Sequence, residues 1–235
     1  MGGVKQNTKH IGNTESTKYI RPTRKTISPK NLLMIGIPRH LTDKSIHDFD
    51  TFGDSQYENV KEVFISYINN IHDNFYNCRG IYMYGSNGSG KSMCASMIIK
   101  EAYKHRYTAY RVTFAEYLNI YTRAWSAKSL NEKDELEIDL YKYKASEFLA
   151  LEEIGKEIEN SVTIPILEDL LRYREDKELP TIICTNLRMT KLREQYGESI
   201  FSLLQGNNMP VKIEGEDQRL NYFNKRCQYN KDVGE

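Results

Sequence analysis

One stretch decides the fold, residues 80–92, which read GIYMYGSNGSGKS. The residues from Arg79 to Tyr84 are mostly apolar or aromatic and predict a short buried strand. Residues 85–92 then follow the pattern G-x-x-x-x-G-K-S, and the residues after them predict a helix over 91–104. A glycine-rich turn between a strand and a helix is the setting in which this pattern binds phosphate, so we predict a phosphate-binding loop here.

The residue types of this loop suit a nucleoside triphosphate. Glycines let the backbone N–H groups turn inward around phosphate oxygens, and the N-terminus of the following helix adds partial positive charge. We expect Lys91 to reach the β- and γ-phosphates and the hydroxyl of Ser92 to coordinate Mg²⁺. We therefore predict ATP and Mg²⁺ as ligands, bound by Gly85, Ser86, Asn87, Gly88, Ser89, Gly90, Lys91 and Ser92.

Two carboxylates end a later apolar run, residues 148–153, which read FLALEE. In P-loop ATPases the first acid at such a strand end holds Mg²⁺, and a second acid can orient the attacking water. We predict these roles for Glu152 and Glu153 respectively; the alternative is that both are solvated at a strand end. Aspartate is usual at the first position, and glutamate lengthens its reach by about 1.5 Å. We therefore expect slow turnover.

Strands and helices alternate on both sides of the loop. Besides residues 79–84 we predict strands over 108–112, 148–151 and 181–185, with helices over 91–104, after the capping box of Thr113 and Glu116, and over 162–173. This alternation predicts an α/β fold with a parallel sheet covered by helices on both faces. We also predict an apolar helix face from Tyr57 to Ile71, a helix over 195–205, a turn at Asn207-Asn208 and a strand over 209–213.

Composition excludes several classes of protein. Lys and Arg number 33 against 32 Asp and Glu, so a globally cationic nucleic-acid coat is excluded, and 39% hydrophobic residues suffice for a core. No apolar run approaches the roughly 18 residues of a membrane span. The cysteines lie far apart without a C-x-x-C pair, which argues against zinc or disulfides and for buried fillers at two of them. We expect a cytoplasmic protein with no membrane partner; its cysteines are Cys78, Cys94, Cys184 and Cys227.

The ordered set of motifs resembles the AAA+ ATPases and, within them, the DnaC/DnaI-type replicative helicase loaders and the related IstB-type transposition helpers. Residues 34–39 (MIGIPR) are similar to the G-I-P-x-R lead-in of the loaders. Residues 151–157 (LEEIGKE) are similar to the acidic pair followed by I-G-x-E, and residues 180–186 (PTIICTN) form the next matching segment. The resemblance covers approximately residues 31–220.

The resemblance implies further site residues. It implies that Asn186, which taken alone would suggest a turn, is the first sensor beside the γ-phosphate and acts with Glu153 in catalysis. It implies that Arg219, which taken alone would suggest a surface residue, is a second sensor that binds nucleotide. We divide the chain into a flexible basic N-terminal arm (1–30), an AAA+ P-loop core (31–186) and a C-terminal helical sensor segment (187–235).

The resemblance also implies self-association, with ATP at the subunit junction and an arginine finger from the neighbour. Residues 196–204 (YGESIFSLL), where that finger is expected, contain no arginine. The candidates left open are Arg172, Arg174, Arg188 and Arg193. Residues 1–30 lack cysteine and are too polar to fold as the helicase-binding domain that loaders carry. This compact organisation suits a phage or mobile-element loader.

A segment after the second predicted strand carries candidate DNA contacts. Residues 121–128 (YTRAWSAK) mix cations with aromatic residues, which suits backbone neutralisation and base stacking on single-stranded DNA. Tyr121 and Trp125 lie four apart on a helix, so we expect core packing for them and predict Arg123 and Lys128 as the DNA-binding residues. Residues 126–144 are charged, and we expect the acidic run 132–139 to be a solvated face.

The resemblance implies an ATPase that loads a replicative hexameric helicase in the initiation of DNA replication. ATP binding would organise subunits around single-stranded DNA and helicase, and hydrolysis would release them. One alternative is an IstB-like transposition helper that acts on duplex DNA with a transposase. Another is a nucleotide-dependent binding adaptor with little hydrolysis, which gains weight from Glu152 and from the missing finger.

Overall fold

A single five-stranded sheet forms the centre of the molecule. The computed structural model describes residues 21–24, 26–157 and 162–215. All neighbouring strands are parallel, in the order β2-β3-β4-β1-β5. The predicted α/β fold with a parallel sheet is therefore confirmed; its strands are β1 (Gly80–Tyr84), β2 (Ala109–Thr113), β3 (Phe148–Ile154), β4 (Thr181–Thr185) and β5 (Asn208–Lys212).

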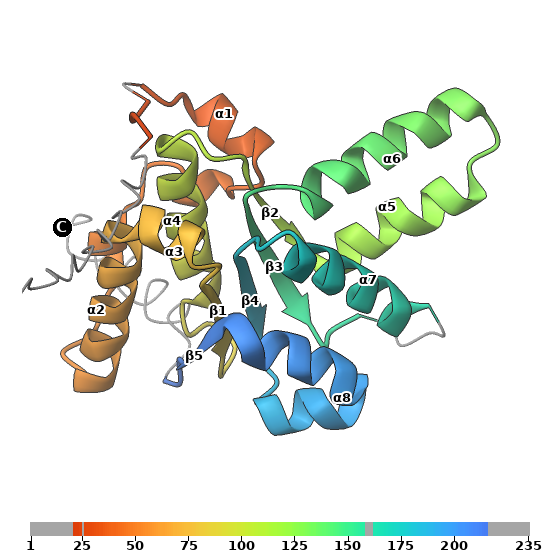
Figure 1. The fold of residues 1–235 in the computed structure, drawn as a ribbon. Helices are drawn as coiled ribbons and strands as arrows, with labels where there is room; N and C mark the ends of the chain where they lie inside the picture. The colour runs from red at the N-terminus through yellow and green to blue at the C-terminus, as the bar shows by residue number, and fades with distance from the viewer. Residues whose placement is uncertain (1–20, 25, 158–161, 216–235) are drawn as a thin grey trace, which may run out of the picture.

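Helices cover both faces of this sheet (Figure 1). One face carries α1 (Pro29–Met34), α2 (Ser55–Asn69), α3 (Ile71–Tyr76) and α4 (Lys91–Lys104), with two 3-10 turns at Arg39–Leu41 and Ile46–Asp48. The opposite face carries α5 (Phe114–Ser126), α7 (Thr163–Asp176) and α8 (Met189–Asn207), and α6 (Leu130–Lys144) packs on α5. The sheet thus separates two hydrophobic cores.

Alternation along the strands assigns side chains to these cores. In β1, Ile81 and Met83 pack in the core on the α4 side, whereas Tyr82 packs in the core on the α7 side. In β3, Phe148 and Ala150 face the α4 side in the same way, because successive side chains of a strand point to opposite faces. This alternation decides which face each polar side chain at the strand ends occupies.

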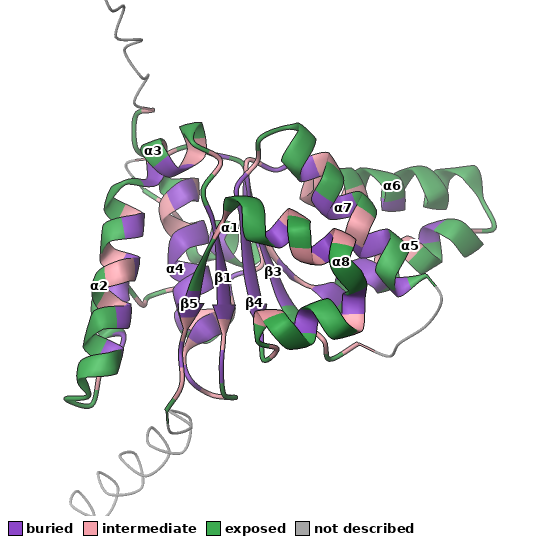
Figure 2. Ribbon diagram, turned by 60° about the horizontal axis from the view of Figure 1, so that its bottom comes forward, coloured by how far each residue is buried: buried purple, intermediate pink, exposed green. Residues whose placement is uncertain are grey.

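The hairpin of α5 and α6 projects away from the sheet (Figures 1 and 2). The predicted capping box starts α5: the hydroxyl of Thr113 accepts from the N–H of Glu116, whose carboxylate accepts from the N–H of Thr113. Helix α6 is absent from our prediction because its charged sequence has almost no apolar period, and Leu136 is its one buried residue. Residues 132–138 are exposed apart from Leu136, and Asp139 is half-buried, so the acidic run is largely solvated, as predicted.

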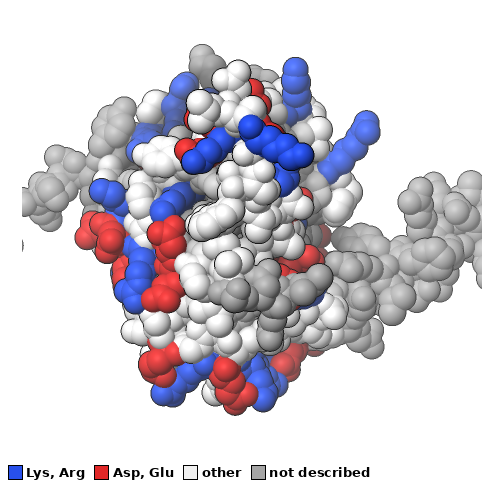
Figure 3. All heavy atoms as spheres, turned by 90° about the vertical axis from the view of Figure 1, so that its right-hand side faces the viewer, with Lys and Arg blue, Asp and Glu red and all other residues white. Residues whose placement is uncertain are grey.

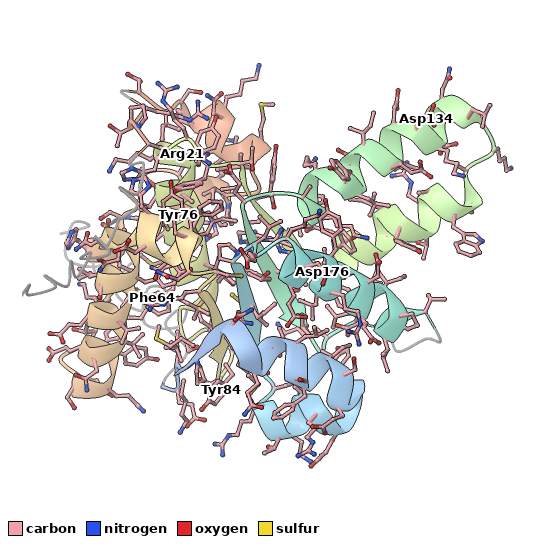
Figure 4. All side chains as sticks on the ribbon, viewed as in Figure 1. Arg21, Phe64, Tyr76, Tyr84, Asp134 and Asp176 are labelled. Carbon is pink, nitrogen blue, oxygen red and sulfur yellow. The ribbon has the colours of Figure 1, made fainter. Side chains whose placement is uncertain are left out.

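The N-terminal segment contacts the core where it is described. Arg21 forms a two-bond ion pair with Glu147 and lies 4.2 Å from the ring of Tyr107, measured from Cζ to the ring centroid. The N–H of Arg24 donates to the carbonyl of Lys104 at 2.7 Å. Figure 4 shows Arg21 beside the α3 end of the molecule, near Tyr76 and far from Asp134 on the hairpin. Of the predicted N-terminal arm (1–30), residues 1–20 lie outside the described residues, and the described arginines Arg21 and Arg24 have carboxylate, aromatic and carbonyl partners.

Three element boundaries differ from the sequence prediction. Strand β3 continues through Glu152 and Glu153 to Ile154, because its last residues still pair with β4. Helix α8 begins at Met189 and kinks at Gly197, where φ is 86°. No turn separates Asn207 from Asn208, since α8 ends at the former and β5 begins at the latter. None of the helices in the described part of the chain is both long and apolar enough to traverse a bilayer.

Candidate nucleotide-binding site

The site lies where three strands end side by side. Strand β4 lies between β1 and β3, so the carboxyl ends of all three meet at one edge of the sheet. A cavity of about 650 Å³ opens there, at the position where open α/β sheets bind their ligands. Residues 87–92 of the predicted phosphate loop line it, whereas Gly85 and Ser86 do not. The rest of the lining is both predicted acids and the predicted sensor, together with His40, Leu41, Lys44, Met93, Lys156, Cys184 and Thr185.

The glycines of the phosphate loop adopt backbone angles that other residues avoid. The φ values of Gly85, Gly88 and Gly90 are 143°, 70° and 98°. At Gly85 a Cβ atom would lie 2.0 Å from the carbonyl oxygen of Ile213, so this position has no room for a side chain. The loop therefore turns tightly from β1 into α4, as the sequence predicts.

Lys91 is buried at the first position of α4. Its Nζ donates to the carbonyl oxygens of Gly85 at 3.0 Å and Ser86 at 2.6 Å, and it lies 3.4 Å from the Oγ of Ser89. The ammonium group thus lies inside the loop whose N–H groups would hold phosphate. The lysine ammonium group only donates hydrogen bonds. Phosphate oxygens in the cavity can therefore take the place of these carbonyl oxygens as its acceptors.

Ser92 and Glu152 are in direct contact in the cavity wall. The hydroxyl of Ser92 donates to Oε2 of Glu152 at 2.8 Å, and Glu152 is only 1% exposed. Arg111 in β2 donates to the same carboxylate through Nε to Oε1 at 2.8 Å and through Nη2 to Oε2 at 2.7 Å. The structure therefore brings the two predicted metal-binding residues together and adds a guanidinium that we did not predict.

Glu153 lies in a β-bulge at the end of β3. The register between β3 and β4 shifts between Glu152 and Ile154, so Glu153 has no partner in the ladder. Its φ is 62°, a left-handed conformation that costs a non-glycine residue of order 1–3 kcal/mol and gathers at functional sites. The bulge turns this half-exposed side chain to the cavity, where its Oε1 accepts from Nζ of Lys156 at 3.1 Å.

Asn186 follows β4 and contacts the phosphate loop. Its Nδ2 donates to Oδ1 of Asn87 at 2.8 Å. The end of β4 is fixed because the hydroxyl of Thr185 donates to the carbonyl of Ile154 at 2.6 Å and accepts from the N–H of Leu187 at 3.0 Å. The predicted first sensor thus contacts the phosphate loop and lines the same cavity as the acidic pair.

A loop before α2 forms part of the cavity wall and was not predicted. It brings His40, Leu41 and Lys44 to the cavity. Lys100 in α4 fastens this loop by donating to the carbonyls of Leu41 at 3.1 Å and Thr42 at 2.9 Å, and burial lowers the pKa of this lysine. Among the site residues that we did not predict, only Arg111 could have been found from the sequence. A charged residue inside a buried strand must be paired, so its position indicates a nearby acceptor.

The two cysteines at the sheet behave as predicted. Cys94 in α4 and Cys184 in β4 are buried, and burial raises the pKa of both thiols. Neither thiol is therefore reactive at neutral pH.

Of the four finger candidates, Arg174 is excluded. It is 1% exposed and donates to the carbonyls of Ser146 and Pro180 and to the hydroxyl of Thr181. Burial lowers its pKa to about 9, so it stays charged at neutral pH as a structural link between α7 and the sheet. Arg172, Arg188 and Arg193 are exposed and paired with Glu168, Glu214 and Glu198.

The remaining predicted residues lie away from the cavity or outside the described chain. Arg123 and Lys128 are exposed at the far end of the α5–α6 hairpin. Tyr121 packs against the core on the α7 side as predicted, but the core packing predicted for Trp125 is wrong, because its side chain is 84% exposed. Figure 1 shows that α5 projects beyond the sheet here, and Ala124 is the buried residue of its last turn. Arg219 lies outside the described residues.

The donor set fits Mg²⁺. This ion prefers oxygen ligands, keeps several waters and takes only one or two carboxylates with the phosphates of its substrate. The hydroxyl of Ser92 donates a hydrogen bond to Glu152, which leaves the lone pairs of its oxygen available to a metal. Ser92 and Glu152 are therefore the residues that would hold the ion. The described residues contain no group of three or more His, Cys, Asp or Glu side chains that could hold a metal by themselves.

Known proteins share this fold. No protein-family model matches the chain. The replicative helicase loader DnaI of Bacillus subtilis (strain 168) is 24% identical over 154 residues, which cover 60% of this chain and 48% of DnaI. A crystal structure of the DnaC helicase loader superposes with a TM-score of 0.64 at 17% identity, covering 75% of this chain and 99% of that one. The crystal structure of DnaI gives 0.60 at 21%, covering 76% and 95%.

A more distant likeness concerns a protein with bound nucleotide. The structure of DnaA from Aquifex aeolicus bound to AMPPCP superposes with a TM-score of 0.57 at 18% identity, covering 79% of this chain and 55% of that one. Sheet order, phosphate loop and acidic strand end therefore define a P-loop protein with the AAA+ ATPase fold. Within that class, the resemblance to the DnaC/DnaI-type helicase loaders is confirmed. The chain spans about half the length of the curated relative that it matches.

Proposed function

We propose that this chain is an ATP-dependent loader of a replicative DNA helicase. The observation that carries the proposal is the meeting of Lys91, Ser92, the acidic pair and Asn186 around one cavity, in a fold shared with helicase loaders. These five polar side chains come from two strand ends, those of β3 and β4, and from the first turn of α4. A magnesium-bound nucleoside triphosphate requires this set of donors and acceptors.

The nucleotide is held by the chain's own backbone and by one lysine. The N–H groups of the loop and the N-terminus of α4 bind phosphate oxygens, and Lys91 exchanges its carbonyl acceptors for phosphate. Mg²⁺, when bound, neutralises charge on the β- and γ-phosphates. Ser92 and Glu152 offer the oxygen atoms to hold it, and their mutual hydrogen bond fixes the direction of the serine hydroxyl.

Hydrolysis is assigned to Glu153 and Asn186. Glu153 accepts a proton from the attacking water as general base, and the amide of Asn186 orients that water beside the γ-phosphate. The bulge and the left-handed backbone hold the carboxylate at the cavity rather than on the far face of the sheet. Lys156 contacts only Oε1 of this carboxylate, in an exposed ion pair, so the other acceptor positions stay open to water.

A second candidate function is a nucleotide-dependent adaptor with little hydrolysis. The glutamate at position 152, where aspartate is usual, favours it, as does the lack of arginine in residues 196–204. The two candidates share nucleotide binding and differ in turnover. Measured hydrolysis that needs Glu153 supports the loader, whereas ATP binding without turnover, alone or with single-stranded DNA and helicase, supports the adaptor.

Single-stranded DNA binding is assigned to the far end of the α5–α6 hairpin. Arg123 and Lys128 supply positive charge, and Trp125 between them offers an exposed ring for base stacking. Figure 3 looks at the molecule from the side to which the hairpin projects: Lys and Arg dominate its upper part, and uncharged surface fills its middle. The transposition-helper alternative predicts a preference for duplex DNA at the same residues.

Loading itself is tested by co-purification and by helicase activity. The full chain is mixed with a hexameric replicative helicase and with ATP–Mg²⁺, ADP or no nucleotide, and complexes are separated by size. The proposal expects an ATP-dependent complex and faster helicase assembly on circular single-stranded DNA. Binding of a transposase with no binding of helicase would replace this proposal by the transposition helper.

A further inference from the structure

Arg111 lies on the sheet face that carries the cavity. It is the third residue of β2, and its Cα pairs with that of Ala150 in β3, two residues before Glu152. Alternation therefore points Arg111 and Glu152 to the same side, toward α4. Their side chains are 15% and 1% exposed, so the pair is largely shielded from water. Arginine side chains are almost never fully buried unless they are paired, so the partners of Arg111 indicate its role.

All three nitrogens of the Arg111 guanidinium have partners. Nε and Nη2 donate to the two carboxylate oxygens of Glu152 at 2.8 and 2.7 Å, a two-bond geometry that fixes the carboxylate in position and in plane. Nη1 donates to the carbonyl of Gly36 at 3.0 Å. Arg111 is thereby held between the lead-in segment and Glu152.

Counting acceptor positions on Glu152 shows what remains for a metal. A carboxylate offers about four lone-pair positions. Three are taken, two by Arg111 and one by the hydroxyl of Ser92. One position is left, and its direction is fixed because the other three are directional. A metal or its bound water therefore meets a carboxylate with a single orientation.

We propose that Arg111 is a positioning residue that orients Glu152 toward Mg²⁺. This proposal rests on the proposed ATP–Mg²⁺ site. Glutamate has one more rotatable bond than aspartate, so an unsupported Glu152 would sample several orientations. The two-bond contact with the guanidinium removes this freedom. It explains how glutamate can stand where aspartate is usual.

The same contacts give the lead-in segment a role. Gly36 has a φ of 88°, and a Cβ atom there would lie 2.0 Å from the carbonyl oxygen of Arg111. The N–H of Arg111 donates to the carbonyl of Ile35 at 2.9 Å. Only glycine allows the lead-in to approach β2 so closely, and this approach places the Gly36 carbonyl on the guanidinium. The lead-in thus acts on the metal-binding acid through Arg111.

The test compares ATP affinity with and without Mg²⁺. Calorimetric titrations use ATP in excess Mg²⁺ and ATP in EDTA, on the full chain and on Arg111→Met, whose apolar side chain keeps much of the volume. We expect the gain in affinity from Mg²⁺ to fall about tenfold, while affinity in EDTA stays within about twofold. If the substitution only disturbed the structure, the affinity for ATP would fall both in Mg²⁺ and in EDTA. Arg21→Met, which removes a similar ion pair with Glu147 outside the site, is the matched control.

Two further variants keep the test decisive if Arg111→Met does not fold. Arg111→Lys keeps the charge but loses the two-bond geometry, and we expect an intermediate loss of the Mg²⁺ gain. Arg111→Met combined with Glu152→Asp removes the guanidinium and the extra methylene together, and we expect it to recover part of the gain.

The outcomes separate the inference from the proposed site. If the natural chain gains affinity from Mg²⁺ and the single variants Arg111→Met and Arg111→Lys gain as much, the inference is overturned and the site stands. If the natural chain itself binds ATP equally with Mg²⁺ and with EDTA, the proposed site is overturned and the inference with it.

Discussion

The cavity and the α5–α6 hairpin are built in opposite ways. Around the cavity, polar side chains already contact one another: Ser92 with Glu152, Glu153 with Lys156, and Asn186 with Asn87. On the hairpin, large apolar side chains face water instead, with exposed fractions of 84% for Trp125, 78% for Leu130, 68% for Ile138 and 62% for Tyr141. The first region is organised before any ligand arrives, which chemistry requires. The second gains contacts only when another molecule binds.

The largest effect is expected at the general base. Glu153→Gln keeps the shape and removes the basic oxygen, so single-turnover hydrolysis of ATP should slow by about 100-fold or more. Affinity for ATP–Mg²⁺ should stay within about twofold, because this residue is assigned no part in binding. Rapid-quench measurements give the rate, and Glu194→Gln on exposed α8 is the control. Equal rates in both variants would remove Glu153 from the mechanism.

The next effect is expected at Lys91. Lys91→Ala removes a charged donor to phosphate, which should weaken ATP–Mg²⁺ binding by about ten- to a hundredfold in calorimetry. Lys104→Ala at the exposed end of the same helix should leave the affinity unchanged. If the Lys91→Ala protein binds ATP as tightly as the natural chain, the assignment of the phosphate site is wrong. The cavity would then not differ from the hairpin as a preorganised binding site.

A smaller effect is expected at the hairpin tip. Trp125→Ala should lower the affinity for a labelled single-stranded oligonucleotide by about tenfold, since stacking on one base is worth about 1–3 kcal/mol. Its affinity for ATP should not change. Tyr141→Ala, another exposed aromatic on the hairpin but away from Arg123 and Lys128, is the control in the same anisotropy assay. If both variants bind alike, the tip is not the stacking site.

The smallest effect is expected in stability. Ile138→Ala on the hairpin should change the free energy of unfolding by less than about 0.5 kcal/mol, because its side chain is already in water. Leu167→Ala in α7, where the side chain is fully buried, should cost about 2–5 kcal/mol. Urea unfolding followed by circular dichroism measures both. Similar losses would mean that the hairpin is packed and not an open surface.

Most of the sheet could be predicted because its signals are local. Runs such as residues 148–151 (FLAL) are uniformly apolar, and the phosphate loop carries its own chemistry in adjacent residues. Helix α6 could not be predicted, since its charged sequence shows no apolar stripe and its stability comes from packing on α5. Trp125 was misjudged because helical spacing does not reveal where the sheet beneath a helix ends.

The candidate site was predictable only in part, for a similar reason. Residues in motifs were found, whereas Arg111 and Lys100 act through partners more than 40 residues away, at Glu152 and at the loop around Leu41. Such contacts depend on which strands and helices become neighbours. A buried arginine demands acceptors, but its sequence does not say which ones.

The exposure of Trp125 also affects how this protein can be studied. It is the only tryptophan of the chain. Indole emission reports the polarity around the ring, and a ring already surrounded by water keeps nearly the same spectrum when the chain unfolds. Its fluorescence will therefore be silent to denaturation and sensitive to whatever covers the hairpin tip, so the molecule carries a built-in optical probe of binding that is free of any signal from the core.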